Sequence, residues 1–164
     1  MKTLYIIRHA KSSWDSSVKS DYERALNKRG ERDAPLMGMV LKQKDIKPNL
    51  ILSSSAKRAK KTALIIAEQI GYKASDIIFD ENLYLASSSE ILEIIQNVDA
   101  HVETLFVIAH NPGLTDFINQ FYKDRISNLP TTGVFSMEFD IVDWKSIKST
   151  PAKNCIFDYP KNHL

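Results

Sequence analysis

The stretch Thr3-Leu4-Tyr5-Ile6-Ile7-Arg8-His9-Ala10 places an apolar, partly β-branched run directly before an arginine and a histidine. Polar and apolar residues do not alternate between Thr3 and Ile7, so the run predicts a strand that is covered on both faces of a sheet. His9 then lies just past the end of that strand. A histidine at a strand end is more often a hydrogen-bonded structural residue than a catalytic one, so the pair Arg8-His9 does not establish a function by itself.

Two further runs of the same kind, 50–52 and 104–109, predict buried strands. Weaker patterns over 134–142 and 155–159 predict short strands at the edges of the sheet, since prolines bracket the second of them. Helical patterns separate the stronger runs. Together they predict an α/β fold, a three-layer α/β/α sandwich with a central, mainly parallel sheet, which binds ligands at the carboxyl ends of its strands.

The helical patterns differ in how well they are delimited. Apolar residues recur at helical spacing over 37–41 and over 59–70. A helix spanning 28–43 would lose a backbone hydrogen bond at Pro35, so a break or kink is expected near that residue.

Helix starts are marked at two later places. Ser87 followed by Glu90 fits a capping box, which predicts a helix over about 88–98. After the strand at 104–109, Asn111 is expected to cap a helix whose first residue is Pro112. The preceding His110 then lies at a strand-to-helix junction.

Composition predicts one domain over residues 1–164, because this length suffices for a single hydrophobic core. Lysine and arginine number 22 against 20 acidic residues, so bulk charge gives no reason to expect a nucleic-acid or membrane partner. The single cysteine, Cys155, has no internal disulfide partner, and neither a signal peptide nor a membrane-spanning run is visible. We therefore expect a cytoplasmic chain.

Basic and imidazole side chains follow three of the predicted strands. His9 follows the first, the segment 53–58 follows the second and His110 follows a later one, so all three are expected at one crevice. A phosphoryl group is bound well by planar donors such as the guanidinium groups of Arg8 and Arg58. Their charge disfavours protonation of a neighbouring imidazole, which leaves it neutral and nucleophilic. The sequence therefore predicts a phosphoryl-transfer site with His9 as nucleophile.

These residues stand in a familiar pattern. Residues 4–11, Leu-Tyr-Ile-Ile-Arg-His-Ala-Lys, resemble the signature of the histidine phosphatase superfamily, which includes the phosphoglycerate mutase-like enzymes. The segments 52–59 and 107–112 agree with the later motifs of that family in order and spacing. The Arg-His-Ala-Lys-Ser-Ser-Trp opening and the stretch 21–30 most resemble the SixA-type phosphohistidine phosphatases. The resemblance covers nearly the whole chain and implies the phosphoglycerate mutase-like sandwich.

The resemblance also implies roles for five residues. His9 would form a phosphohistidine intermediate, and Arg8, Arg24, Arg58 and His110 would surround the phosphate. Neither a metal nor another cofactor is implied. The reaction would be two in-line displacements, with water attacking phospho-His9 in the second. The implied partner is a protein that carries phosphohistidine, or a small phosphorylated metabolite.

The general acid of the larger relatives has no counterpart at the expected place. They carry a catalytic glutamate shortly after the third strand, where this chain reads Glu-Asn-Leu-Tyr-Leu-Ala over 81–86. Glu81, Asp80 and Asp21 remain as candidate proton donors. An alcohol leaving group resembles water, with a pKa of about 15.7, and needs acid assistance, whereas imidazole titrates near about 6.5. The departure therefore favours phosphohistidine over sugar phosphates as substrate.

Two other functions stay open. One is a small-molecule phosphomonoesterase or a phosphomutase of the same superfamily, although mutases generally carry extra segments that this chain has little length to supply. The other is a catalytically silent module that binds phosphorylated ligands, against which the intact His9 and His110 count.

The sequence allows two positions for each of three side chains, one at the pocket and one elsewhere in the fold. Arg58 is expected to point inward while the neighbouring lysines at 57, 60 and 61 are solvated. Trp14 is expected at the mouth of the pocket rather than in the core. Arg24 either binds phosphate or pairs with Asp21 at the surface, where an ion pair contributes little.

Overall fold

The computed structural model describes residues 1–15, 17 and 20–164, and in this part of the chain six strands form one sheet. Their order across the sheet is 3-2-4-1-5-6 in sequence numbering. The four neighbouring strands numbered 3, 2, 4 and 1 are parallel to one another. Strand 5 is antiparallel to strand 1, and strand 6 is antiparallel to strand 5. The mainly parallel sheet is confirmed. The strands are β1 (Lys2–Arg8), β2 (Leu50–Ser54), β3 (Ile78–Asp80), β4 (Thr104–Ala109), β5 (Val134–Phe139) and β6 (Lys153–Asp158).

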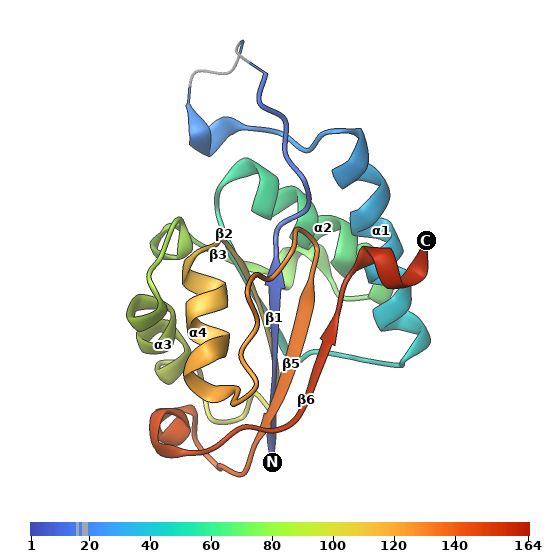
Figure 1. The fold of residues 1–164 in the computed structure, drawn as a ribbon. Coiled ribbons are helices and arrows are strands. Elements are labelled where there is room, and N and C mark those ends of the chain that lie inside the picture. Colours follow the sequence, from blue (N-terminus) through green and yellow to red (C-terminus); the bar gives the residue numbers. More distant parts are fainter. Residues whose placement is uncertain (16, 18–19) are drawn as a thin grey trace.

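Helices cover the sheet on both faces, as the three-layer prediction requires (Figure 1). Two lie on one side and two on the other, with short 3-10 helices in the connections. In the described part of the chain, no helix has the length and apolar character to cross a membrane. The four helices are α1 (Lys28–Gln43), α2 (Lys57–Ile70), α3 (Ser88–Gln96) and α4 (Gly113–Phe121), and the 3-10 helices are Asp21–Glu23, Ala74–Asp76, Glu81–Leu83, Trp144–Ser149 and Pro160–His163.

Strand β1 is buried on both faces, which explains its unbroken apolar sequence. Leu4 and Ile6 pack in the core cluster that contains the apolar faces of α3 and α4. Ile7 packs in the cluster on the opposite side of the sheet, with Met37 of α1 and Ile66 of α2. Each cluster removes a large apolar area from water and so contributes much of the stability of its layer.

The expected break at Pro35 is wrong, because α1 is continuous from Lys28 to Gln43 with the proline inside it. Asn27 caps the helix by accepting a hydrogen bond from the backbone N–H of Gly30. Residues on both sides of the proline, including Ala34 and Met37, are fully buried. Burial of this face offsets the loss of one backbone hydrogen bond.

Two smaller expectations also need correction. Helix α4 begins at Gly113 with Pro112 at the N-cap position, one residue later than predicted, although the Asn111 side chain still accepts a hydrogen bond from the backbone of Thr115 at 3.1 Å. The weak patterns over 134–142 and 155–159 correspond to β5 and β6, but only β6 lies at an edge of the sheet. The capping box of Ser87 and Glu90 is confirmed.

Replacing Gly113 by alanine is expected to destabilise the fold. A Cβ atom at this position would lie 1.9 Å from the backbone oxygen of Ala86, which cannot move aside as a flexible side chain could. We expect a loss of about 3 kcal/mol in the free energy of unfolding, measured by urea denaturation. Gly38→Ala is the comparison: its Cβ would meet Cβ and Cγ of Gln69 at 2.9 Å, so a shift is needed there too, but alanine gains about 1 kcal/mol in helix propensity and a smaller loss is expected. An equal effect of both substitutions would contradict the prediction.

Candidate active site

The register of the sheet brings two histidines together. Arg8, the last residue of β1, pairs with Ala109, the last residue of β4. The residue that follows each strand is a histidine, and the ring centroids of His9 and His110 lie 5.1 Å apart. Both side chains are buried. The shared edge expected from the parallel strands is therefore present.

The hydrogen bonds of His9 assign its tautomer. Its Nδ1 lies 2.8 Å from the carbonyl oxygen of Ala10, which can only accept, so Nδ1 carries the proton. Its Nε2 lies 3.3 Å from Nε of Arg58, which can only donate, so Nε2 carries a lone pair. The long Arg58 contact is a weak hydrogen bond. The lone pair on Nε2 is thus the candidate nucleophile.

Burial keeps both imidazoles neutral. The pKa of His9 is lowered to about 3, first by burial and then by the nearby His110, Arg58 and Arg8, against the opposing hydrogen bond to Ala10. The pKa of His110 is also lowered to about 3 by burial and by Arg58. Protonation would remove the lone pair of Nε2, so these shifts keep that lone pair available at neutral pH.

The free energy of unfolding is expected to fall as the pH drops from about 7 to about 5. Folded His9 and His110 keep pKa values of about 3, whereas unfolded imidazoles bind protons near 6.5, so the unfolded state takes up more protons in this range. The loss is about 2 kcal/mol for each histidine. Urea denaturation at both pH values measures it, with the double variant His9→Gln, His110→Gln as reference. An equally steep pH dependence in that variant would contradict the prediction.

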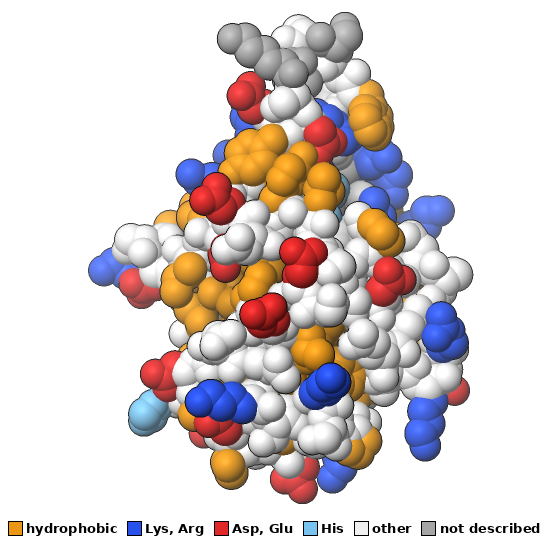
Figure 2. Space-filling model, turned by 90° about the vertical axis from the view of Figure 1, so that its left-hand side faces the viewer, with side chains coloured by type: hydrophobic (Ala, Val, Ile, Leu, Met, Phe, Trp, Pro, Cys, Tyr) orange, Lys and Arg blue, Asp and Glu red, His pale blue; other side chains and the backbone are white. Residues whose placement is uncertain are grey.

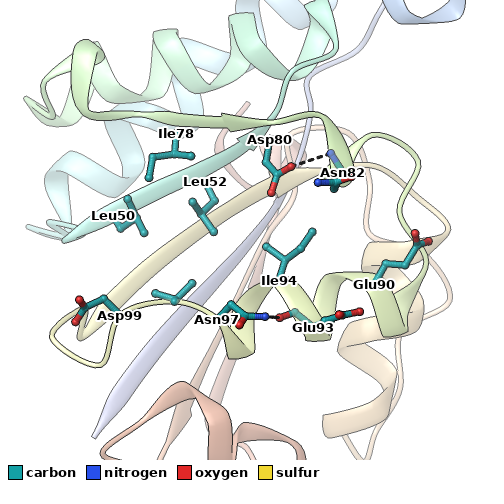
Figure 3. A pocket seen from close by; sticks show the side chains of 11 residues that line it. Leu50, Leu52, Ile78, Asp80, Asn82, Glu90, Glu93, Ile94, Asn97 and Asp99 are labelled. Carbon is teal, nitrogen blue, oxygen red and sulfur yellow. Dashed lines mark hydrogen bonds between the residues drawn. The ribbon is translucent and has the colours of Figure 1, made fainter.

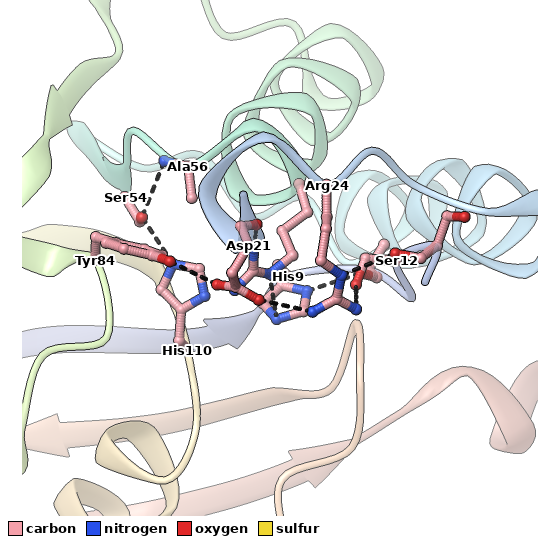
Figure 4. Close-up of polar contacts among 11 residues, drawn as sticks. His9, Ser12, Asp21, Arg24, Ser54, Ala56, Tyr84 and His110 are labelled. Carbon is pink, nitrogen blue, oxygen red and sulfur yellow. Dashed lines mark hydrogen bonds and ion pairs between the residues drawn. The ribbon is translucent and has the colours of Figure 1, made fainter. Parts of the chain in front are cut away.

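A carboxylate connects the arginines of the site (Figure 4). Asp21 accepts a hydrogen bond from Arg24 at 2.9 Å and another from Arg58 at 2.9 Å, one on each carboxylate oxygen. The hydroxyl of Tyr84 donates to the same carboxylate at 2.6 Å. Arg24 and Arg58 are buried, so Arg24 is more than a surface partner of Asp21. The contacts hold both guanidinium groups beside His9.

Polar atoms without partners face this region. Among the described residues, Nε of Arg8 and Nδ1 of His110 are buried and have no hydrogen-bond partner. Nε2 of His110 lies 2.7 Å from Oγ of Ser54, which already accepts from the backbone of Ala56 at 3.2 Å. With the Ser54 hydroxyl donating to Nε2, Nδ1 of His110 carries a proton. Such donors are costly when unpaired, and a bound anion would satisfy them.

A cavity of about 190 Å³ contains these groups. The structure therefore brings together all five residues that the sequence singled out as nucleophile or phosphate ligands. Trp14 also lines the cavity, with 77% of its surface exposed and the guanidinium carbon of Arg24 3.4 Å from its ring centroid. Arg58 points inward beside exposed lysines, as expected. The lining residues are Arg8, His9, Lys11, Ser12, Trp14, Arg24, Arg58, Leu85, His110, Asn111 and Thr131.

The acidic residues considered as proton donors do not line this cavity. Glu81 is exposed in its 3-10 helix, and Asp80 caps that helix. Burial would raise the pKa of Asp21, but hydrogen bonds from Tyr84, Arg24 and Arg58 hold it well below its usual range. Asp21 therefore carries no proton at neutral pH. Within the described residues, no cluster of three histidine, cysteine or acidic side chains is arranged to hold a metal ion.

Two residues of the site were not found from the sequence. Tyr84 packs edge-on against the ring of His110, at 5.4 Å between centroids. Thr132 has a φ of 58°, a strained value for a β-branched residue, and its backbone N–H lies 3.1 Å from the carbonyl oxygens of both Arg8 and His9. This contact holds the backbone of the Arg8-His9 pair. No local sequence pattern marks either residue, because their partners lie far away along the chain.

A model of the histidine phosphatase superfamily (branch 1) matches residues 4–84. The match includes His9, Asp21, Arg24, Arg58 and Tyr84. The chain belongs to the histidine phosphatase superfamily. Among the matched residues, His9, Arg24 and Arg58 line the cavity described above.

Two solved phosphatase structures and one plant protein are similar to the chain. The structure of the protein histidine phosphatase SixA complexed with tungstate has a TM-score of 0.83 and 19% identity, and 99% of each chain is covered. A mycobacterial glucosyl-3-phosphoglycerate phosphatase complexed with VO3 has a TM-score of 0.69 and 12% identity over 93% of this chain and 97% of its own. A chloroplastic protein of Arabidopsis thaliana is 32% identical over 120 residues, 68% of this chain and 55% of the relative. The chain therefore spans about half the length of that relative.

Proposed function

We propose that the protein is a phosphatase that transfers a phosphoryl group to Nε2 of His9 and then to water. The observation that carries this proposal is the tautomer of His9, whose Nδ1–H is bound to a carbonyl while Nε2 keeps its lone pair inside a cavity lined by three arginines. Guanidinium groups and unpaired N–H donors suit the spread charge of a phosphoryl group.

The reaction proceeds in two displacements. In the first, Nε2 forms a bond to phosphorus while the bond from phosphorus to the leaving group breaks, and the leaving group retains the electron pair. In the second, a water oxygen bonds to phosphorus, the bond to Nε2 breaks and the proton of the water goes to solvent or to the released phosphate. Arg8, Arg24, Arg58 and Nδ1 of His110 hold the phosphoryl oxygens through both steps.

The Arg24 and Arg58 side chains must exchange partners when a phosphoryl group binds. In the structure, the carboxylate of Asp21 receives hydrogen bonds from both. In addition, Nε of Arg58 donates to Nε2 of His9, and Nη2 of Arg24 donates to Oγ of Ser12. A phosphoryl oxygen takes up these donors, while Tyr84 keeps Asp21 in place through its hydroxyl.

The substrate that the site suits best is phosphohistidine in a protein. Among the described residues, no carboxylic acid lines the cavity, and Asp21 is held ionised beside it. An alcohol needs a proton as it leaves, with a pKa of about 15.7 for the water-like case, whereas an imidazole leaves without strong acid assistance. The small-molecule phosphatase among the structural neighbours keeps sugar phosphates as the second candidate class.

Turnover of a peptide carrying phosphohistidine is expected to exceed that of glycerol phosphate by about 100-fold or more in kcat/KM, because the leaving groups differ in their need for a proton donor. Phosphate release measures both rates, and the His9→Ala variant supplies the background of spontaneous hydrolysis. Equal or faster hydrolysis of glycerol phosphate would overturn the substrate assignment. It would leave the role of His9 intact.

A further inference from the structure

A second, larger hollow of about 650 Å³ lies away from the active site, between the β2–β3 edge of the sheet and helix α3 (Figure 3). Leu50, Leu52 and Ile78 project into it from the two strands, and Ile94 projects from the helix on the opposite wall. Ile78 is 51% exposed. We call this hollow the β3–α3 groove. Its floor is formed by these apolar side chains.

The groove exists because the two faces of β2 and β3 are covered unequally. Ile51 and Ile77 point to the other face, where they are buried in the core cluster with α2. On the groove side, α3 lies beside the strands rather than over them, so Leu50 and Ile78 keep contact with solvent. The layer of helices on this face therefore leaves room for one more amphipathic element next to α3.

The rim of the groove is acidic. Asp80, Glu90, Glu93 and Asp99 line it, and no lysine or arginine does among the described residues. On this face, apolar side chains lie among acidic ones (Figure 2). The whole chain carries a formal charge of +2, so the negative charge is a local property of the groove.

These acidic groups are only partly engaged within the chain. Glu90 completes the capping box of α3, and this hydrogen bond holds its pKa below the usual range. Asp80 caps the 3-10 helix Glu81–Leu83, and Asp99 contacts the exposed His101 at 2.8 Å. Glu93 is exposed on α3 between the other acids. An apolar floor with an ionised rim is complementary to an apolar stripe flanked by cations.

We propose that the β3–α3 groove docks a cationic amphipathic helix of a partner protein. The apolar stripe of that helix packs on Leu50, Ile78 and Ile94, and its lysine or arginine side chains face the acidic rim. Interhelical packing at about 8–10 Å from α3 places the helix in the open position of the layer. The groove is joined to the active site by the segment 80–84, which begins at the groove with Asp80 and ends with Tyr84 at Asp21.

The test uses a fluorescein-labelled peptide of about 16 residues with leucine at helical spacing and lysine on both flanks, titrated with the full chain and followed by anisotropy. A second peptide carries glutamate in place of every lysine. We expect saturable binding of the lysine peptide and binding at least about tenfold weaker for the glutamate peptide. Shifts of leucine and isoleucine methyl signals in NMR spectra are expected at Leu50, Ile78 and Ile94.

Two variants separate docking in the groove from general attraction. Glu93→Lys and Ile78→Gln are each expected to weaken binding by about tenfold, since they remove a rim charge and part of the floor. Glu68→Lys is the matched control, because Glu68 is exposed on α2, on the opposite face of the sheet, and its charge change equals that of Glu93→Lys. Thermal unfolding verifies that each variant is folded.

Several results would overturn the proposal. They are the absence of saturable binding up to about 1 mM peptide, equal loss in Glu68→Lys and Glu93→Lys, or methyl shifts outside the groove. The basic start of α2, with Lys57, Lys60 and Lys61, makes a second copy of the chain the alternative occupant. Sedimentation velocity that detects self-association in the wild type, abolished by Glu93→Lys, would assign the groove to that copy instead.

Discussion

Replacing His9 by alanine is expected to abolish hydrolysis of p-nitrophenyl phosphate, with kcat reduced by at least about 1,000-fold. The substitution removes the Nε2 lone pair, so no covalent intermediate can form. The nitrophenolate leaving group departs without a proton donor, which makes this substrate a direct probe of the nucleophile rather than of the acid. Release of nitrophenolate, followed by absorbance, measures the rate.

The same variant should still bind phosphate. Arg8, Arg24 and Arg58 do not depend on His9 for their hydrogen bonds to Leu129, Asp21 and Ser13. Isothermal titration with vanadate or phosphate is therefore expected to give an affinity within about tenfold of the wild type. Retained binding with lost turnover separates the chemistry of His9 from a structural role.

A matched histidine supplies the control. His101 is exposed, and within the described part of the chain its ring hydrogen-bonds only to Asp99. His101→Ala is expected to keep full activity. Equal rates in the wild type and in His9→Ala, or equal losses in the two histidine variants, would exclude His9 as the nucleophile.

The strands that place the active site could be predicted because each is buried on both faces. The apolar runs before His9 and His110 have no polar interruption, and β1 and β4 form where they were expected. Parallel strands end at one edge of a sheet, so the two histidines had to approach one another. The exact pairing of Arg8 with Ala109 depends on the register, which no local pattern fixes.

The remaining parts of the site depend on contacts between distant segments. Strand β3 has only three residues, and its apolar run Ile77-Ile78-Phe79 is shorter than that of β1, so it was not among the predicted strands. Tyr84 becomes part of the site because the chain after β3 turns toward Asp21, 63 residues earlier in the sequence. The continuity of α1 through Pro35 likewise reflects packing, since the intrinsic preference of proline opposes it.

Asp21 illustrates why a candidate list from sequence is broader than the site. As one of three nearby acids, it could be considered a proton donor. The structure surrounds its carboxylate with Arg24, Arg58 and Tyr84, all of which donate to it. Hydrogen-bond donors stabilise the ionised form of a carboxylate. Asp21 therefore holds its negative charge and is a poor proton donor.

Replacing Arg58 by alanine is expected to lower kcat/KM for p-nitrophenyl phosphate by about 100-fold to 1,000-fold. The buried guanidinium contacts Nε2 of the proposed nucleophile His9 at 3.3 Å and the carboxylate of Asp21 at 2.9 Å, so it bridges these two groups. Its loss removes a phosphate donor. It also leaves the ionised Asp21 near the place where the phosphoryl group binds, with one fewer positive charge to offset it.

Arg58→Lys distinguishes charge from geometry at this position. Lysine restores a positive charge but has a single nitrogen, which cannot contact His9 and Asp21 as the three guanidinium nitrogens do. We therefore expect kcat/KM of Arg58→Lys to exceed that of Arg58→Ala by less than about tenfold, because orientation of the donors contributes more than net charge. Arg32→Ala is the control, since Arg32 is half exposed and pairs with Asp33 on α1. Full activity in Arg58→Lys would mean that charge alone suffices, whereas full activity in Arg58→Ala would remove Arg58 from the proposed site.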